Sequence, residues 1–394
     1  MYRSSGDFLE NIKVSGQELD EIANAPVLKV ELFKSPVIIE SIELLFNNGL
    51  YFIRTRSKDG TEGVSVGSER PVYLHLILNQ LIIPYFIGKD ARDLEELIEG
   101  VYVYGSNYKL AGLALWCCIS WVEASILDLL GKIAKQPLGN LLGEVIRNEV
   151  NIYVASGNRG TTPEEEVEIL AGRVAETGAK AIKFKVGGRM SKNADSIKGR
   201  SEGLIYLTRK HFGDSMTIHA DGNGSYDPPV AIEYGRILEE INAYFYEEPC
   251  PFDNLWETKE VADALDIPLA FGEQETSMRR FKWIIENNAA QVIQPDIQYF
   301  GGFIRTTKVA RMAARAGKPI TPHISGGFSY VYVLHLASYI PNIGKFQEHK
   351  AGFKETCRLF NPYLELKDGT IKAPTGPGLG MELDGSLLKK AYKI

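Results

Sequence analysis

The sequence predicts an α/β protein whose larger part is a (β/α)-barrel of eight strands and seven helices, preceded by an α+β domain. From residue 150 onward, eight short apolar runs alternate with helical segments. Between residues 37 and 68, three strand-like runs are joined by tight-turn sequences, which is the pattern of an antiparallel meander. Three of the later runs end in an acid at equal spacing, so those acids are expected at one end of a parallel barrel.

Composition restricts the class of protein. A chain of 394 residues favours two domains, and 44% hydrophobic with 24% charged residues is typical of a soluble globular protein. The net charge of −6 and the lack of a basic stripe argue against nucleic-acid binding. The four cysteines show no metal-ligand or redox spacing, and the adjacent Cys117 and Cys118 are expected as buried thiols.

The sequence gives no sign of a membrane protein or a secreted one. The apolar run 110–122 has 13 residues, fewer than the roughly 20 that span a bilayer, so it predicts a core helix. The first residues, MYRSSGDFLENIKVSG, lack the apolar core of a signal peptide. We therefore expect a cytoplasmic protein without membrane partners, and we expect it to form a homo-oligomer.

Residues 1–36 are interpreted as an N-terminal extension with one helix, Gly16–Asn24, and one strand, 27–33. An α+β domain is expected over residues 37–149. Its meander turns at Asn48-Gly49 and at Asp59-Gly60, since these pairs readily adopt the positive φ angles of tight hairpins. Residues 70–143 follow as helices, and Gly131 and Pro137 interrupt the most apolar of them.

The barrel is expected over residues 150–350. Helix starts are marked by a capping residue followed by proline, as in Thr162-Pro163 and Asp227-Pro228. An open doubly wound sheet is the alternative, but it would struggle to bring six strand ends to one point. The turn-rich tail, 351–394, is expected to return to the first domain. The eight predicted strands are 151–156, 181–187, 216–222, 243–249, 268–274, 292–297, 319–325 and 344–349.

Three acids at strand ends predict a metal site. Asp221, Glu247 and Glu273 are each 26 residues apart, which is the length of one β/α repeat. Converging carboxylates repel one another unless a cation holds them, and an all-oxygen set suits Mg²⁺ or Mn²⁺ rather than zinc. Alternation from Phe245 turns Glu247 inward and leaves Glu248 as a neighbour of the ligands. The pattern favours a divalent-metal enzyme.

Lys183 and Lys185 lie on one face of the second barrel strand, and apolar residues occupy its other face. Because the apolar face should meet the helices, the lysines are expected to point into the barrel. Two neighbouring ammonium groups lower each other's pKa, which would produce an amine able to act as a base. His219 falls on the same inward face of the next strand and is interpreted as a satisfied interior histidine.

Strand six ends in Asp296 and strand seven in His323, so an acid is expected beside an imidazole. Such an acid fixes the histidine tautomer and raises its basicity. The eighth strand ends in Glu348 and His349, and the sequence leaves open which of the two faces the site.

Together these motifs resemble the enolase superfamily, in its mandelate racemase and acid-sugar dehydratase branch, over residues 37–388. The resemblance is carried by EASILDLLGK, PLGNLLG, the Lys-x-Lys pair, DGN, EEP, GE, QPD with GG, the histidine strand and PTGPGLG. It implies a (β/α)7β modified TIM barrel under an α+β capping domain. It also implies that Asp221, Glu247 and Glu273 bind Mg²⁺. Lys185, tuned by Lys183, would be one base, and His323 with Asp296 would be the base on the opposite face. Glu348 would hydrogen-bond the substrate carboxylate, and Asn223 would lie near the substrate.

Two departures from the family bear on the substrate, a small-molecule carboxylate. Residues 187–200 lengthen the segment after the lysines, giving 36 residues from Lys185 to Asp221, so this loop is expected to border the substrate. The turn at 47–50 is short where relatives carry a longer lid, which suggests a mouth open to a polyhydroxylated chain.

The implied chemistry is abstraction of the proton alpha to a carboxylate through a metal-stabilised enediolate. We predict a lyase that dehydrates an aldonic or aldaric acid to a 2-keto-3-deoxy acid. A racemase, epimerase or cycloisomerase is the alternative, since a lysine and a histidine on opposite faces also suit those reactions. A Schiff-base aldolase using Lys183 or Lys185 is a remote alternative, because it would leave three convergent acids unexplained.

Overall fold

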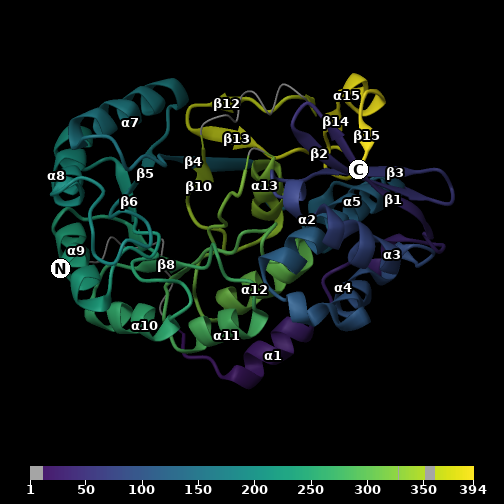
Figure 1. Ribbon diagram of the computed structural model, residues 1–394, viewed down its shortest axis with the longest axis horizontal. Coiled ribbons are helices and arrows are strands. Elements are labelled where there is room, and N and C mark those ends of the chain that lie inside the picture. The colour runs from purple at the N-terminus through teal and green to yellow at the C-terminus, as the bar shows by residue number, and fades with distance from the viewer. Residues whose placement is uncertain (1–11, 327, 351–359) are drawn as a thin grey trace.

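The computed structural model describes residues 12–326, 328–350 and 360–394. Two parts lie side by side in Figure 1, with the helices α7 to α12 surrounding a strand core on one side and the helices α2 to α5 with a small sheet on the other. The first part supplies the candidate site, and the second covers it from one flank.

The smaller part is built on the expected meander. Its strands are β1 (Ile39–Asn47), β2 (Leu50–Ser57) and β3 (Glu62–Val66), paired antiparallel in that order. Asn48 and Gly49 have φ angles of 48° and 80°, so the two-residue turn is the one that the Asn-Gly pair predicts. The helical elements that follow are α2 (Pro71–Ile77), α3 (Ile83–Phe86), α4 (Leu94–Val103), α5 (Leu113–Ala134) and α6 (Leu138–Leu142).

Helix α5 is the core of this part and is longer than the 13-residue apolar run suggests. It has 22 residues, and every residue from Leu115 to Gly131 is buried. Within the described residues, α5 is the one helix long and apolar enough to cross a membrane, but 89% of its most apolar window is covered by the rest of the protein. Cys117 and Cys118 are free and buried in it, as expected.

The larger part is a closed barrel. Six parallel strands are neighbours in chain order: β4 (Glu149–Ala155), β5 (Ala181–Lys185), β6 (Thr217–Asp221), β7 (Phe245–Glu247), β8 (Leu269–Phe271) and β9 (Val292–Ile293). Parallel bridges join Ile293 to Ile320 and Ile320 to Ile343, and β10 (Gln347–His349) then pairs with β4. The eight positions therefore form a ring, and the predicted fold class is confirmed.

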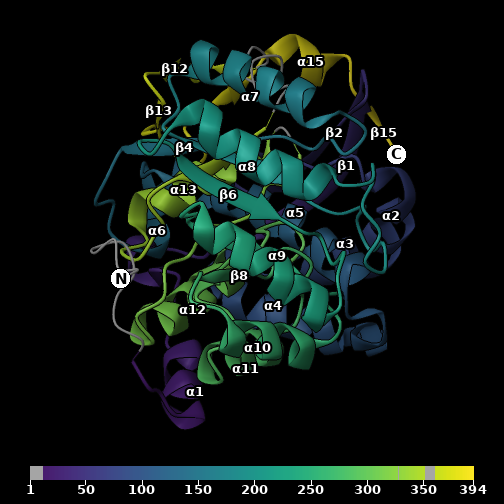
Figure 2. The same ribbon diagram turned by 90° about the vertical axis from the view of Figure 1, so that its left-hand side faces the viewer.

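Seven helices connect these eight positions: α7 (Pro163–Thr177), α8 (Arg200–Phe212), α9 (Pro228–Glu240), α10 (Leu255–Ala264), α11 (Met278–Glu286), α12 (Phe303–Arg315) and α13 (Ser329–Tyr339). Figure 2 shows α7, α8 and α9 lying in succession across the outside of the barrel. The seventh barrel position, expected as a strand over 319–325, forms only isolated bridges. Pro319 and Pro322 remove two backbone donors there, so a regular ladder cannot form.

Helix α1 (Gly16–Asn24) of the N-terminal extension packs beneath the barrel helices α11 and α12 (Figure 1). This helix forms as predicted, with Ser15 and Glu18 capping each other's backbone N–H groups. The strand predicted over 27–33 is wrong, since Val30–Leu32 is a short 3₁₀ helix with Val30 51% exposed. The Glu95 carboxylate accepts hydrogen bonds from the N–H groups of Val27 and Leu28, so this backbone has no strand partner.

A buried carboxylate joins the two parts. Glu123 of α5 accepts hydrogen bonds from the N–H groups of Phe303 (2.6 Å) and Ile304 (2.9 Å) at the start of α12. Gly302 has a φ of 109°, and a Cβ there would lie 1.9 Å from the Glu123 carboxylate. Only glycine allows this approach. Burial raises the pKa of Glu123 to about 8.

The tail crosses both parts of the molecule. Strand β13 (Thr370–Lys372) pairs with barrel strand β4, and β15 (Tyr392–Lys393) pairs with β1 of the small sheet. Residues 351–359 and the first 11 residues of the extension lie outside the described chain, and the domain boundaries proposed from the sequence stay predictions.

Candidate active site

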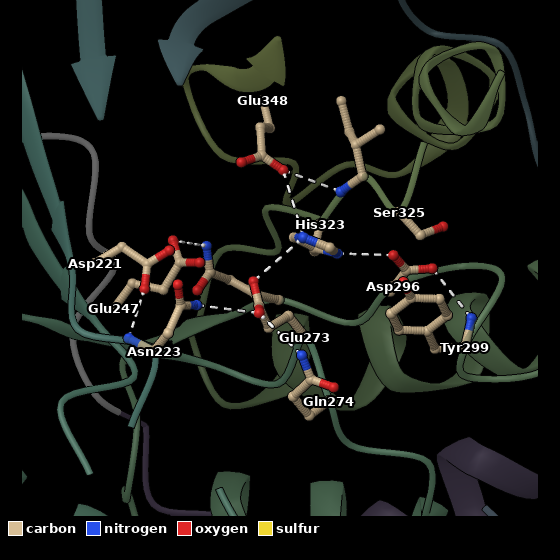
Figure 3. Close-up of polar contacts among 12 residues, drawn as sticks. Asp221, Asn223, Glu247, Glu273, Gln274, Asp296, Tyr299, His323, Ser325 and Glu348 are labelled. Carbon is tan, nitrogen blue, oxygen red and sulfur yellow. Dashed lines mark hydrogen bonds and ion pairs between the residues drawn. The ribbon is translucent and has the colours of Figure 1, made fainter. Parts of the chain in front are cut away.

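The three predicted metal ligands meet at the C-terminal end of the barrel strands. Asp221 ends β6, Glu247 ends β7, and Glu273 follows β8 by two residues. The register pairs Lys185 with Asp221 and Asp221 with Glu247, which places their side chains on one inward face. Ligand oxygens of the three acids lie within 4.8 Å of one another, and all three residues are buried (Figure 3).

The electrostatics of this cluster fit a cation. Burial and the charge of Asp221 raise the pKa of Glu247 well above its ordinary value. Burial acts in the same direction on Asp221, but the ammonium groups of Lys185 and Lys183 outweigh it and lower the pKa of this acid. Three buried carboxylates offer only oxygen donors, and a hard divalent cation placed among them would remove their mutual repulsion. The set is therefore a candidate metal site.

The two lysines lie inside the barrel as predicted, and both contact acids. Lys183 donates to Glu247 (2.7 Å) and lies 3.0 Å from Glu348, while Lys185 donates to Asp221. Burial disfavours the ammonium form of Lys183, but the carboxylates of Glu247 and Glu348 dominate and raise its pKa well above its ordinary value. The predicted lowering is therefore wrong for Lys183, because nearby negative charge outweighs repulsion between ammonium groups.

His323 and Asp296 form the predicted pair. His323 Nδ1 lies 2.7 Å from Asp296 Oδ2, and the other carboxylate oxygen accepts the N–H group of Tyr299 (Figure 3). The same oxygen also accepts the N–H group of Gln298. The acid therefore holds the proton on Nδ1 and leaves Nε2 facing the cluster, 3.3 Å from Glu273. This geometry places an imidazole nitrogen beside the candidate metal site.

The structure decides which residue of the eighth strand faces the site. Glu348 contacts Lys183 and accepts the N–H of Ile324 (3.0 Å), whereas the His349 ring packs edge-on against Tyr330. Burial opposes ionisation of Glu348, but Lys183 and neighbouring cations lower its pKa well below its ordinary value. An ionised Glu348 has no proton to donate to a substrate carboxylate, so the expected hydrogen bond between them would require a protonated Glu348 and stays a prediction.

Several residues of the site were missed from the sequence. Lys350 Nζ lies 2.9 Å from His323 Nε2 and 3.3 Å from Glu348. Gln294 donates to Glu247 (3.1 Å). Each stands two residues from a predicted site residue, Gln294 before Asp296 and Lys350 after Glu348, so strand alternation was the available signal.

Asn223 links the metal cluster to two further residues that were missed. Its backbone N–H donates to Asp221 (2.8 Å), and its side-chain amide donates to Glu273 (3.2 Å). Its amide oxygen accepts hydrogen bonds from Arg159 (2.7 Å) and Arg189 (3.4 Å). Asn223 is buried between these groups, so any contact with the substrate stays a prediction.

One interior residue, His219, differs from its expected surroundings. His219 is buried and stacks on Phe245 with ring centroids 4.0 Å apart, but neither ring nitrogen has a hydrogen-bond partner among the described residues. The expectation of a satisfied histidine is wrong, because its neighbours on this layer are aromatic rings. Glu248 is also buried, and burial together with the charge of Glu273 raises its pKa well above its ordinary value.

Comparisons with known proteins agree with this geometry. Residues 166–387 match the family described as Enolase C-terminal domain-like. The chain is 30% identical over 386 residues to L-talarate/galactarate dehydratase from Salmonella typhimurium, covering 96% of this chain and 90% of that protein. It is 28% identical over 325 residues to arabinonate dehydratase from Saccharolobus solfataricus, covering 81% and 83%. A mandelate racemase/muconate lactonizing protein from Paracoccus denitrificans, solved complexed with magnesium, superimposes with a TM-score of 0.83 at 25% identity, covering 91% and 99%.

Proposed function

Because this chain is an enzyme that belongs to the enolase superfamily, in its mandelate racemase and acid-sugar dehydratase branch, we propose that it dehydrates a sugar acid to a 2-keto-3-deoxy acid. The substrate would be an aldonic or aldaric acid of five or six carbons, and the enzyme would be a carbon–oxygen lyase. Relatives that are named as dehydratases of sugar acids support the reaction type.

One observation carries the proposal. The buried carboxylate cluster has a lysine on one side and a histidine on the other, with Lys185 against Asp221 and His323 Nε2 3.3 Å from Glu273. A substrate bound over the cluster would have proton-transfer groups on both faces of its α-carbon.

Asp221, Glu247 and Glu273 would hold Mg²⁺, with Mn²⁺ as the other suitable ion. When bound, this cation supplies positive charge that offsets the second negative charge developing beside the substrate carboxylate as the α-proton leaves. The relative solved with magnesium supports this choice of ion.

The chain's own groups would move the protons. Lys185 or His323 takes the α-proton, and the electron pair of the broken C–H bond forms a carbon–carbon double bond as the β-hydroxyl departs. The hydroxyl leaves as water once it receives a proton, and the imidazolium of His323, stabilised by Asp296, is the suited donor. The enol that remains tautomerises to the keto acid. Lys183 and Glu348, paired at 3.0 Å, would fix the floor of the site.

The isomerase alternative uses the same groups, since two opposed bases can also remove a proton from one face and return it to the other. It differs only in keeping the β-hydroxyl. A Schiff base on Lys183 is disfavoured, because its ammonium group is paired with Glu247 and Glu348 and its pKa is raised well above its ordinary value.

The test is a screen of a stereochemically complete set of five- and six-carbon aldonic and aldaric acids with Mg²⁺. Semicarbazide detects the 2-keto product, and polarimetry is run in parallel. We expect keto-acid formation from at least one acid. A change in optical rotation without keto product from any acid would overturn dehydration and favour the isomerase. The expectation of a cytoplasmic homo-oligomer without nucleic-acid or membrane partners stays a prediction.

A further inference from the structure

Two arginines on successive loops converge on one amide at the mouth of the barrel. Arg159 lies in the loop after β4 and Arg189 in the loop after β5, and both donate to Asn223 Oδ1, at 2.7 and 3.4 Å. The amide nitrogen of the same side chain donates to Glu273 at 3.2 Å. A single amide group therefore separates each guanidinium from a candidate metal ligand.

Within the described chain these two charges have no carboxylate in direct contact, although Asp221 and Glu273 act on Arg159 from a distance. Among the described residues neither guanidinium makes an ion pair with a carboxylate, and besides Asn223 the Arg159 side chain donates only to the backbone oxygen of Gly187 (3.1 Å). A guanidinium carries five N–H donors, so most of those on the two residues have no protein acceptor here. Arg159 is half-buried, where an unpaired charge is costly, whereas Arg189 is exposed. The pair suits an anion that arrives from solvent.

The loop that carries Arg189 is held in an unfavourable conformation. Arg189, Met190, Lys192 and Asn193 have φ angles of 64°, 49°, 52° and 70°. Bonds to the next loop maintain this shape, since the N–H of Arg189 donates to Ser225 Oγ (3.0 Å) and the N–H of Met190 donates to Asn223 O (3.1 Å). Positive φ angles are energetically unfavourable for residues other than glycine, and backbone strain of this kind is more frequent at ligand-binding sites.

A third arginine, Arg200, forms hydrogen bonds to the segments that carry both of these arginines. Arg200 is buried and donates to the backbone oxygens of Lys185 (2.9 Å) at the end of β5 and of Thr161 (2.6 Å) and Asn158 (3.2 Å) in the loop after β4. The segments that carry Arg159 and Arg189 are therefore fixed relative to each other and to the strand that bears Lys185. The two guanidinium groups are positioned before any ligand binds.

We propose that Arg159 and Arg189 form a subsite for the second carboxylate of a dicarboxylic sugar acid, so that aldaric acids are preferred to aldonic acids. This inference rests on the proposed function, because it assigns the far end of the same substrate. A six-carbon acid is about 6 Å long between its terminal carbons, given C–C bonds of about 1.5 Å. With one carboxylate at the metal cluster, its other end reaches past Asn223, where paired guanidinium forks recognise a carboxylate.

The first test compares six-carbon aldaric acids with the aldonic acids of matching configuration. We expect the wild type to favour aldaric acids at least tenfold in kcat/KM. Arg189→Gln and Arg159→Gln should raise KM for aldaric acids by about 10- to 100-fold, as expected for lost charge-assisted hydrogen bonds, with a smaller change in kcat. KM for aldonic acids should rise far less than KM for aldaric acids, and Arg159→Lys should restore part of the loss. Lys198→Gln is the matched control, because it removes one positive charge from an exposed position of the same loop.

The comparison of aldaric with aldonic acids in these variants distinguishes a substrate subsite from a structural role of the two arginines. If the arginines only hold Asn223 and the metal ligands, both variants should impair aldonic and aldaric acids equally and mainly in kcat. That result, or a wild type that dehydrates aldonic acids without favouring aldaric ones, overturns the subsite and leaves the proposed function standing. Arg189 is exposed, so its variant should fold normally, and thermal unfolding checks the Arg159 variants.

Calorimetric titration of the Mg²⁺-loaded protein with the same acids gives a readout that is independent of turnover. We expect aldaric acids to bind at least tenfold more tightly than the matched aldonic acids, and Arg189→Gln to abolish this difference. If no acid yields a keto product, the proposed function fails, and this binding difference still upholds the subsite. Equal binding of the two classes by the wild type, or no detectable binding of either, overturns it.

Discussion

Glu123 offers the sharpest test of how the two parts of the molecule are joined. Its side chain is completely buried and accepts two N–H groups at the start of α12. Replacement by alanine would leave both donors buried without an acceptor, at about 1–3 kcal/mol each. We therefore expect Glu123→Ala to lower the free energy of unfolding by about 4 kcal/mol.

The pH dependence of the same residue tests its charge. Burial raises the pKa of Glu123 from 4.5 to about 8, so the folded protein holds this proton more tightly than the unfolded chain does. The stabilisation is complete below pH 4.5 and is lost as the pH rises through 8. A shift of this size corresponds to a loss on the order of 5 kcal/mol.

The measurement is urea unfolding of the wild type and of Glu123→Gln at several pH values between 5 and 9. The glutamine keeps one oxygen acceptor and cannot ionise, so the difference between the two proteins isolates this group. We expect the free energy of unfolding of the wild type to exceed that of Glu123→Gln by less and less as the pH rises. A difference that stays constant or grows would mean that Glu123 is ionised in the folded protein, and that the two N–H groups and the α12 dipole outweigh burial.

Three further predictions concern the site. Glu247→Gln should fold normally but lose both activity and the rise in unfolding temperature that Mg²⁺ gives the wild type, and EDTA should silence the wild type reversibly; full activity in chelated protein would contradict the metal site. In D₂O, Lys185→Ala and His323→Asn should lose exchange of the α-proton for opposite configurations, as followed by NMR, because the two groups lie on opposite sides of the cluster; loss for the same configuration in both would refute opposed bases. Asp296→Asn should lower kcat about 10²- to 10⁴-fold, because an amide can stabilise the wrong tautomer of His323; an unchanged kcat and pH profile would remove Asp296 from the mechanism.

Local patterns in the sequence determined much of the fold and the centre of the site. Alternation with a period of two places Lys183, Lys185 and Asp221 on one inward face, and repeats of equal length bring the three acids to the same end of the barrel. Asp296 and His323 could be paired because they end neighbouring predicted strands, and a parallel bridge joins them in the structure. These inferences depend only on the repeat of the backbone within each strand and on the length of each β/α unit, and both can be read from residues close together in the sequence.

The prediction of a strand over 27–33 was wrong because it relied on the strand propensity of these residues alone. A strand also needs a neighbouring strand, and here the Glu95 carboxylate accepts the N–H groups of Val27 and Leu28 instead. The high pKa of Lys183 was missed, because the sequence placed Glu247 and Glu348 in the site without showing that both lie against this ammonium group. A pKa reports every charge nearby in space, and sequence spacing gives only some of those neighbours.

The convergence of Arg159 and Arg189 on Asn223 was also decided by tertiary structure alone. Each arginine stands in a different loop, and neither loop has a periodic pattern from which a side-chain direction could be read. Their positions depend on the brace from Arg200 and on bonds between loops that are separated by a helix and a strand. The alternation of strand residues therefore allowed the residues at the strand ends to be predicted from the sequence. The loops at the mouth of the barrel have no such repeat, so the contacts between them form only when the barrel closes.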